Sequence, residues 1–511
     1  MQTRNRVVSS DCGADRWNVL NSLSGFCHRL IYLKIGDPDC WHDTRMVHAA
    51  PSTSLSFDAD LIRKYDHFGP RYTSYPTADR FTEAFTAEHL VNALFTRAAE
   101  GAAQPLSLYV HVPFCNTVCY YCACNKVVTK DHGRSAKYIR YLGREVAILS
   151  ALVNPEVPVK QLHWGGGTPT FLSADEMTRL MRVLRDNFNF AHDAELSIEI
   201  DPRQVSVADI ALLAQLGFNR MSLGVQDFDP DVQKAVNRLQ SEAETRAVLE
   251  AARAHGFRSL NVDLIYGLPR QTLSGFDVTL DKVLRDAPDR IALYSYAHVP
   301  HLFKPQRRIS DADLPSPDVK LEILERAIEK MTSAGYVHIG MDHFALPNDE
   351  LAVAQREGRL QRNFQGYATD ADCDLLSFGI SAIGKVGTAY SQNVRALDEY
   401  YDRLDADALP TFRGWQLSAD DRLRRDVIQA LMCQFKVSVD LVEDAHAIAF
   451  QEYFATELQA LKPLINDGLI EVAPDAITVT RRGRLLVRTV AMVFDRYLRE
   501  QREQARYSRV I

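Results

Sequence analysis

Short apolar runs recur through the middle of the chain, and a segment with helical periodicity follows each of them. The apolar runs predict strands at 106–112, 160–164, 195–200, 220–225, 259–265 and 290–296. The segments between them predict helices at 135–153, 174–188, 206–215, 242–255 and 272–286. Strands that are apolar almost throughout, alternating with helices, indicate a parallel sheet covered by helices. The sequence therefore predicts an α/β fold whose six units fit a partial (β/α)6 barrel of the TIM type.

The pattern changes after the sixth unit. A polar, proline-rich loop begins at residue 297, and a helix is expected at 316–334. Residues 335–345 end like a strand, with Asp342 and His343 as polar candidates, although an isolated histidine is more often structural than catalytic. Residues 363–383 are rich in glycine and short side chains, and we interpret them as a loop.

The last hundred residues form a separate pattern. Residues 417–432 predict a helix, and residues 463–490 predict a helix, a hairpin and a second helix. This order is similar to a winged-helix module, which would make the C-terminal domain mainly helical. Its basic residues are few and are interleaved with acids, so a structural or lid role is favoured over DNA binding.

These patterns predict four parts of the chain. We expect an N-terminal extension at 1–50 that is disordered or dispensable, and an N-terminal substrate or lid segment at 51–105. The partial barrel with its extension is expected at 106–405, and the C-terminal helical domain at 406–511. Within 1–50, Cys12, Cys27 and Cys40 match no ligand spacing, and translation could begin at Met46.

Composition narrows the class of protein further. The chain has 511 residues, 46% of them hydrophobic, and a formal net charge of −7, which argues weakly against a nucleic-acid partner. It contains no apolar run of about 18 residues, so we expect no membrane partner. Nine cysteines at irregular spacings fit a reduced compartment better than a disulfide framework. The sequence predicts a cytoplasmic protein, and we expect a monomer.

One stretch, 109–126 (YVHVPFCNTVCYYCACNK), carries the clearest chemical signal. It places Cys115, Cys119, Cys122 and Cys124 within ten residues, directly after a predicted strand. Soft thiolates gathered in this way suit an iron–sulfur cluster or zinc. Structural zinc usually takes two separated C-x2-C pairs, and nothing else in the chain indicates the oxidising compartment of a disulfide. The C-x3-C-x2-C spacing favours a [4Fe–4S] cluster, in which three thiolates leave one iron open.

Polar residues follow the later predicted strands, where such barrels place their chemistry. Gly165–Thr170 would let a ligand approach the backbone closely, and Glu199 could bind ribose hydroxyls or an ammonium, or form a salt bridge inside the barrel. Gln226 supplies an amide, and Arg238 could pair with a carboxylate or be a solvated helix residue. Asp263 is a charge inside an apolar run, which structure or ligand binding would explain equally.

The loop 69–77 (GPRYTSYPT) is rigid and extended, because it combines two prolines with a glycine. It is either an ordinary connector or a contact for a flat ring that bears carboxylates, since it also carries two tyrosines and Arg71. The residues alone do not favour either of these two interpretations of the loop.

The cysteine spacing resembles that of the radical SAM superfamily, whose open iron binds S-adenosylmethionine (SAM). From about residue 55 to the end, the chain resembles the oxygen-independent coproporphyrinogen III oxidase family. The motifs that carry this resemblance are GPRYTSYPT, YVHVPFCNTVCYYCACNK, QLHWGGGTPT, GVQDF, NVDLIYGLP, GMDHFA and NFQGY. The haem-chaperone relatives typically lack Cys124 and the PRYTSYP loop, and this chain has both. Only the extension before about residue 50 departs from the family.

The resemblance implies a set of site residues. Cys115, Cys119 and Cys122 would ligate one [4Fe–4S] cluster, while Cys124 would act in the substrate pocket. The positions that match contacts to a first SAM molecule are Tyr109, Gly166, Glu199 and Ile383. The positions that match contacts to a second SAM molecule are Tyr121, Gly167, Thr168, Gln226, Arg238, Asp263 and Ala297. The family often has Phe where this chain has Tyr121.

The resemblance also implies the activity. A radical made from SAM would remove a hydrogen from a propionate of coproporphyrinogen III, and loss of CO2 would leave a vinyl group. Two such steps would give protoporphyrinogen IX for haem synthesis, with an electron donor and acceptor that the sequence does not identify. Arg71, Arg307 and Arg308 are candidates for binding the substrate carboxylates. The alternatives are a haem chaperone and another radical SAM enzyme, such as a methyltransferase.

Overall fold

A twelve-stranded mixed sheet dominates the computed structural model, which describes residues 55–99, 104–369, 373–500 and 509–510. The predicted extension 1–50, with Met46 and its three cysteines, lies outside these residues. The strand order is β16-β15-β14-β13-β1-β4-β5-β6-β7-β8-β10-β9. Six neighbouring strands in this order are parallel and follow chain order. They are β1 (Leu106–Val112), β4 (Pro158–Gly166), β5 (Asn189–Ile200), β6 (Arg220–Gln226), β7 (Ser259–Tyr266) and β8 (Arg290–Ser295).

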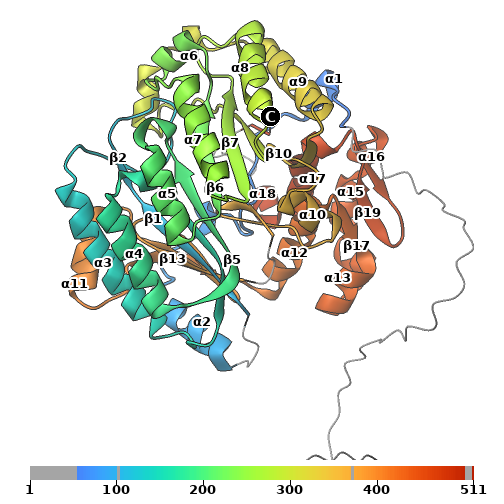
Figure 1. Cartoon of the computed structure of the whole chain (residues 1–511). Helices are drawn as coiled ribbons and strands as arrows, with labels where there is room; N and C mark the ends of the chain where they lie inside the picture. Colours follow the sequence, from blue (N-terminus) through green and yellow to red (C-terminus); the bar gives the residue numbers. More distant parts are fainter. Residues whose placement is uncertain (1–54, 100–103, 370–372, 501–508, 511) are drawn as a thin grey trace, which may run out of the picture. The chain divides into compact units, whose positions relative to one another are not determined.

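All six predicted strands are therefore present, and helices join them. The connecting helices are α3 (Gly133–Ser150), α4 (Ala174–Asn187), α5 (Val207–Leu216), α6 (Pro230–Ala235), α7 (Glu242–Ala254) and α8 (Leu273–Asp286). Figure 1 shows α4, α5, α7 and α8 along one face of these strands. The α/β fold is confirmed. The curvature that a partial barrel requires stays a prediction.

Local sequence explains where several of these helices begin. Ser173, Ser206 and Ser241 each accept a hydrogen bond from the backbone N–H three residues later, and an acidic side chain at that position bonds back to the serine N–H. Such capping boxes satisfy donors that a helix start leaves free, and each cap stabilises its helix by roughly 1 kcal/mol. Helix α5 ends at Gly217, whose φ of 99° favours glycine.

Strands on both sides extend the parallel core. On one side lie β13 (Asp374–Phe378), β14 (Ile383–Val386), β15 (Ala389–Asn393) and β16 (Thr411–Gln416). On the other side lie β10 (His343–Ala345) and β9 (Val337–Gly340). The interpretation of 363–383 as a loop is wrong in part, because β13 pairs in parallel with β1. All five residues of β13 are buried, so the strand shows no alternation of polar and apolar positions from which it could be recognised.

The remaining elements surround this sheet. The N-terminal helices are α1 (Ala59–Tyr65) and α2 (Ala87–Ala99). The helices between β8 and the C-terminal part are α9 (Pro317–Ser333), α10 (Glu350–Arg356) and α11 (Leu397–Asp405). Strands β11 (Gln361–Asn363) and β12 (Gly366–Ala368) form a hairpin between α10 and α11. The predicted helix at 316–334 corresponds to α9. β16 follows the predicted domain boundary at 405/406 and still pairs with β15, and the boundary itself stays a prediction.

The C-terminal part is mainly helical, as predicted. It packs in an apolar cluster that it shares with Tyr65, Tyr72 and Tyr75 of the N-terminal segment and with residues of β9 and α10. A three-stranded sheet in the order β17-β19-β18 lies among its helices. Its elements are α12 (Ala419–Gln434), β17 (Lys436–Ser438), α13 (Val439–His446), α14 (Phe450–Tyr453), α15 (Ala455–Ala460), α16 (Lys462–Asn466), β18 (Ile470–Val472), β19 (Ala476–Val479), α17 (Val487–Val493) and α18 (Arg496–Glu500). No helix in the described part of the chain is long and apolar enough to cross a membrane.

Candidate active site

The cysteine loop leaves the sheet at the C-terminal end of β1. Two short parallel strands, β2 (Phe114–Cys115) and β3 (Val127–Val128), pair at the base of the loop. The amide of Val127 also donates to the carbonyl of Pro113 at 2.7 Å, and that of Thr129 donates to Cys115 at 3.0 Å. Backbone hydrogen bonds therefore join the start of the loop, at 113–115, to its end, at 127–129. The loop emerges at the end of the sheet where parallel α/β folds place their active sites.

Cationic groups surround the thiols of this loop. Nη1 of Arg238 lies 3.7 Å from Sγ of Cys119, and Nη2 of Arg203 lies 3.8 Å from the same sulfur. Lys126 donates to the carbonyls of Cys122 and, at 3.4 Å, Cys124. Positive charge close to cysteines favours the thiolate form, which is the form that binds metals. The sequence had indicated Arg238 but not Arg203.

The four thiols differ in their surroundings. Burial raises the pKa of Cys115 to about 11, and Sγ of Cys115 lies 3.5 Å from Oγ1 of Thr168. A hydrogen bond with Cys124 lowers the pKa of Cys122 to about 6, and the same bond raises the pKa of Cys124. Among the described residues, no three His, Cys, Asp or Glu side chains form a ready-made metal-binding group. The three-cysteine ligand set therefore stays a prediction.

The glycine run at the C-terminal end of β4 packs directly against the cysteine loop. The amide of Gly167 donates to the carbonyl of Val112 at 2.8 Å. A Cβ at Gly167 would lie 2.6 Å from the carbonyl of Pro113, and one at Gly166 (φ 116°) would lie 2.6 Å from the ring of His111. Only glycine fits these positions, because a side chain would collide with the strand end that carries the cysteines.

Glu199, at the end of β5, lies beside this glycine run. Its carboxylate accepts a hydrogen bond from the Gly166 amide at 3.1 Å, and its Oε1 lies 3.3 Å from Nε2 of His163. Burial raises the pKa of Glu199, but the hydrogen bonds and the nearby histidines outweigh burial and hold the pKa below its ordinary value. The Tyr109 ring stacks on His163 with centroids 5.8 Å apart. Tyr109, Gly166 and Glu199 thus come together around His163, which the sequence analysis missed.

Two buried polar atoms lack partners near Cys119. The side chains of Gln226 and Arg238 both approach Gly224, since a Cβ there would lie 2.7 Å from Nε2 of Gln226 and 3.1 Å from Nη2 of Arg238. Nη1 of Arg238 also pairs with Asp201 at 3.2 Å. Within the described residues, Oε1 of Gln226 and Nε of Arg238 have no hydrogen-bond partner. Buried polar atoms are normally paired, so these two can receive a polar ligand.

Asp263, on β7, lies among polar side chains of its own strand and of the neighbouring β6. It accepts hydrogen bonds from Asn261 at 2.8 Å and Ser222 at 3.1 Å. Burial, followed by the charge of Glu199, raises the pKa of Asp263 to about 7. A cavity of about 170 Å³ connects Asp263 and Glu199 with Tyr294, and we call it the central cavity.

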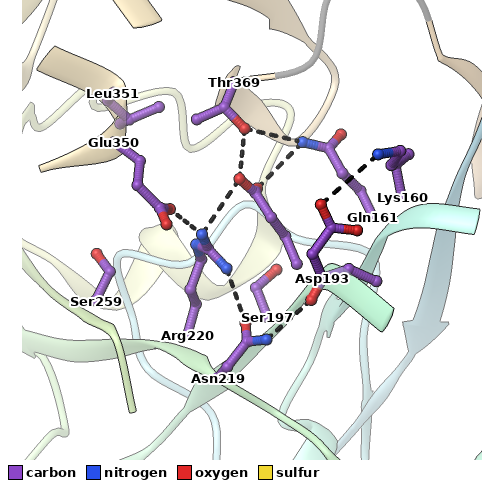
Figure 2. Close-up of polar contacts among 12 residues, drawn as sticks. Lys160, Gln161, Asp193, Ser197, Asn219, Arg220, Ser259, Glu350, Leu351 and Thr369 are labelled. Carbon is purple, nitrogen blue, oxygen red and sulfur yellow. Dashed lines mark hydrogen bonds and ion pairs between the residues drawn. The ribbon is translucent and has the colours of Figure 1, made fainter. Parts of the chain in front are cut away.

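A polar network closes the other end of the central cavity. Figure 2 shows Arg220, at the start of β6, in contact with the carboxylate of Glu350. The guanidinium also pairs with Glu195 at 3.2 Å. Glu195 in turn accepts from Thr369 at 2.5 Å and from Gln161 at 3.2 Å. This network occupies the N-terminal ends of the strands. The predicted site residues Glu199 and Gln226 lie toward the opposite, C-terminal ends of β5 and β6.

The remaining predicted residues lie around the same edge. Nε2 of Gln306 donates to the carbonyls of Tyr121 at 3.1 Å and Ala297 at 3.2 Å, so it links two proposed cofactor contacts. The carbonyl of Ile383 accepts from Ser377 at 2.5 Å. Among the proposed substrate arginines, Arg71 pairs with Asp342, Arg307 donates to Pro300 at 3.0 Å, and Arg308 donates to Tyr120 at 3.2 Å.

The residues present fit the cofactors of a radical SAM site. Cys115, Cys119 and Cys122 would be the donor set of a cluster with one open iron. The unpaired Gln226 and Arg238 atoms offer an acceptor and a donor to a polar molecule held beside Cys119. The glycine run brings its backbone close to the same loop.

Comparison with family models gives the class of protein. A model described as the radical SAM superfamily matches residues 109–283, which include the cysteine loop and β1 to α8. A second model, described as the HemN C-terminal domain, matches residues 417–486. The chain is a radical SAM protein, as its cysteine spacing indicated.

Curated relatives and a solved structure give the family. The chain is 52% identical to the oxygen-independent coproporphyrinogen III oxidase of Pseudomonas aeruginosa, over 90% of this chain and 99% of the relative. It is 49% identical to that of Escherichia coli, over 89% and 99%. The solved coproporphyrinogen III oxidase (HemN) from Escherichia coli, whose title calls it a radical SAM enzyme, matches with a TM-score of 0.83 and 48% identity, over 87% of this chain and 100% of that chain. The chain belongs to the oxygen-independent coproporphyrinogen III oxidase family.

Proposed function

We propose that this enzyme converts two propionate side chains of coproporphyrinogen III to vinyl groups without oxygen, giving protoporphyrinogen IX for haem synthesis. The observation that carries the proposal is the loop at the end of β1 with Cys115, Cys119 and Cys122. The chain that carries this loop matches an oxidase relative over nine tenths of its length.

The chemistry requires an unusual reagent. The β-hydrogen of a propionate is unactivated, so no side-chain base removes it as a proton near neutral pH. A [4Fe–4S] cluster and SAM, when bound, supply a radical that can remove it as a hydrogen atom. Cys115, Cys119 and Cys122 would hold the cluster, and the guanidinium groups of Arg203 and Arg238 would balance the charge of Cys119.

Two groups of residues support two SAM molecules per chain. Tyr109, Gly166 and Glu199 converge on His163, and with Ile383 they would contact a first SAM. Gln226 and Arg238 would offer their unpaired atoms to a second SAM. The other proposed contacts to the second molecule are Tyr121, Gly167, Thr168, Asp263 and Ala297.

Cys124 has a separate proposed role. Cys124 is an exposed residue of the loop, and its thiol hydrogen-bonds that of Cys122. We infer that it acts on the substrate side of the cluster. Loss of CO2 with formation of a vinyl group removes electrons from the substrate, so the proposal includes an electron acceptor as well as a donor. We propose a cytoplasmic monomer.

Anaerobic reconstitution tests the function. Holoenzyme with a measured iron content is mixed with SAM, a reductant and coproporphyrinogen III, and CO2 and the tetrapyrrole products are quantified. The proposal expects two molecules of CO2 per molecule of protoporphyrinogen IX. An intact cluster with no CO2 release would reject the oxidase and leave the haem chaperone, and a methylated product would indicate a methyltransferase.

A further inference from the structure

A second cavity, of about 340 Å³, lies beyond the C-terminal ends of β7 and β8. Helix α9, the segment that includes Phe68 and Arg71, and the start of α17 form its other walls. We call it the basic cavity. Its volume lies within the range of small-molecule sites. Its apolar lining includes Leu293, Leu314, Leu324, Ile328, Phe344 and Leu485.

The basic cavity carries an excess of positive charge. Its lining includes four cations, Arg71, Lys320, Arg488 and Arg509, but Asp342 is the single acidic residue in that lining. Asp342 pairs with Arg71. Asp66, outside the lining, pairs with Arg509 at 3.1 Å. In the part of the chain that the structure describes, neither Lys320 nor Arg488 forms an ion pair with a carboxylate, so two positive charges stay uncompensated.

Arg488 is a structural cation. It is buried, and its guanidinium donates to the backbone carbonyls of Gly69, Pro70, Arg509 and Val510. These bonds attach the two chain segments that close the cavity to α17. Arg488 therefore contributes charge to the cavity while its own donors are engaged.

Lys320 is the cation that can reach a ligand. Its ammonium donates to Oγ of Ser295 at 2.9 Å and to the carbonyl of Tyr296 at 3.4 Å, and it lies 5.5 Å from the centroid of the Tyr266 ring. An ammonium has three donors, so one is left for an anion. A partly buried ammonium without a carboxylate is unfavourable unless a ligand compensates its charge.

The basic cavity adjoins the proposed active site. Ala297, a proposed SAM contact, lines its wall. The guanidinium of Arg71 lies over the Tyr294 ring, 5.8 Å from its centroid, and Tyr294 in turn lines the central cavity with Asp263 and Glu199. A ligand in the basic cavity would thus lie next to the residues that hold the cofactors.

We propose that the basic cavity binds part of the tetrapyrrole, with Lys320 pairing with a propionate carboxylate that is not being decarboxylated. This inference rests on the proposed function. The apolar lining would pack against the pyrrole rings, while the charge of Arg488, which has no carboxylate partner among the described residues, would add to the field that attracts the substrate's carboxylates.

The test replaces Lys320 in the reconstituted holoenzyme. The probe is coproporphyrin III, the oxidised, fluorescent form of the substrate, and its affinity is measured by fluorescence titration. For Lys320→Met we expect about tenfold weaker binding, a similar rise in KM for coproporphyrinogen III, and unchanged iron content. The melting temperature should change little, because removal of a charge without a carboxylate partner in the described part of the chain offsets the loss of the hydrogen bonds to Ser295 and Tyr296.

Lys330→Met on the same helix is the matched control. Lys330 pairs with Asp277 at 2.8 Å and Asp281 at 2.7 Å and does not line the cavity. Its loss should lower the melting temperature while leaving porphyrin affinity and KM unchanged.

The possible outcomes separate the two proposals. Wild-type KM and wild-type porphyrin affinity in Lys320→Met would overturn the cavity assignment and leave the function intact. If the wild type fails to bind the porphyrin, the KM comparison decides alone. Failure of wild-type holoenzyme to decarboxylate coproporphyrinogen III would overturn the function itself.

Discussion

Glu145 makes the stability of this enzyme depend on pH in a way that one substitution can isolate. It lies on α3 and is fully buried, and its carboxylate accepts three hydrogen bonds. The donors are the Tyr400 hydroxyl and the Asn393 amide, both at 2.6 Å, and the backbone of Gly379 at 2.7 Å. These bonds fix the turn that leads into β14, where the proposed SAM contact Ile383 lies.

The magnitude follows from the environment of the carboxyl group. Burial raises the pKa of Glu145 to about 7 from an ordinary value of 4.5, since its hydrogen bonds offset burial only in part. Below pH 4.5 the group is protonated in both the folded and the unfolded chain. Between pH 4.5 and 7 the unfolded chain has released its proton while the folded chain keeps it, so the free energy of unfolding falls by about 3 kcal/mol across this window. Stability from this group is therefore greatest in acid, and little of it is left above pH 7.

Glu145→Gln removes the ionisable group and keeps an oxygen acceptor. The free energy of unfolding, measured with urea between pH 5 and 8, should fall with pH by about 2.5 kcal/mol less in the variant than in the wild type. Other raised carboxyl pKa values, such as that of Asp495 at about 6, are common to both proteins and cancel. The exposed Glu322→Gln is the control and should follow the wild type. Parallel pH profiles for wild type and Glu145→Gln would refute the reasoning.

Three other substitutions test the site and its supports. Gly167→Ala should reduce iron content severalfold, because its Cβ would lie 2.6 Å from the Pro113 carbonyl. The control Gly143→Ala should retain iron, since the nearest atom to its Cβ would be 3.9 Å away. Equal iron contents in the two variants would contradict this packing. Cys124→Ser should keep the cluster and lose turnover, and loss of iron would instead make Cys124 a ligand. Arg488→Met should lower the free energy of unfolding by about 3 kcal/mol or more in urea denaturation, because it leaves several buried carbonyls unpaired, and unchanged stability would contradict that role.

Periodicity was sufficient for the parallel core because each strand contains an apolar run and each helix has a buried stripe. It was insufficient for β13, which is five residues long and wholly buried. Its pairing with β1 joins residues more than two hundred and fifty positions apart, as with Leu106 and Asp374. No local pattern encodes such a contact.

In the candidate site, too, local sequence signals were predictive and long-range contacts were not. Cysteine spacing identified the loop, because ligand spacing is local. By contrast, His163 and Asp201 had no local signal: His163 gains its role from Glu199 on the next strand, and Asp201 from Arg238, 37 residues later. Arg71 was a candidate from its loop, yet its partner Asp342 follows 271 residues later. Such pairs become visible once the strand order is known.

The most direct measurement follows the hydrogen that leaves the substrate. Coproporphyrinogen III labelled with deuterium at the propionate β-carbons is incubated anaerobically with the reconstituted enzyme, SAM and reductant. The account predicts that the label appears in the 5′-deoxyadenosine released from SAM, together with vinyl product and CO2. Label released to water, with unlabelled 5′-deoxyadenosine, would contradict hydrogen-atom removal and with it the function proposed for the cysteine loop.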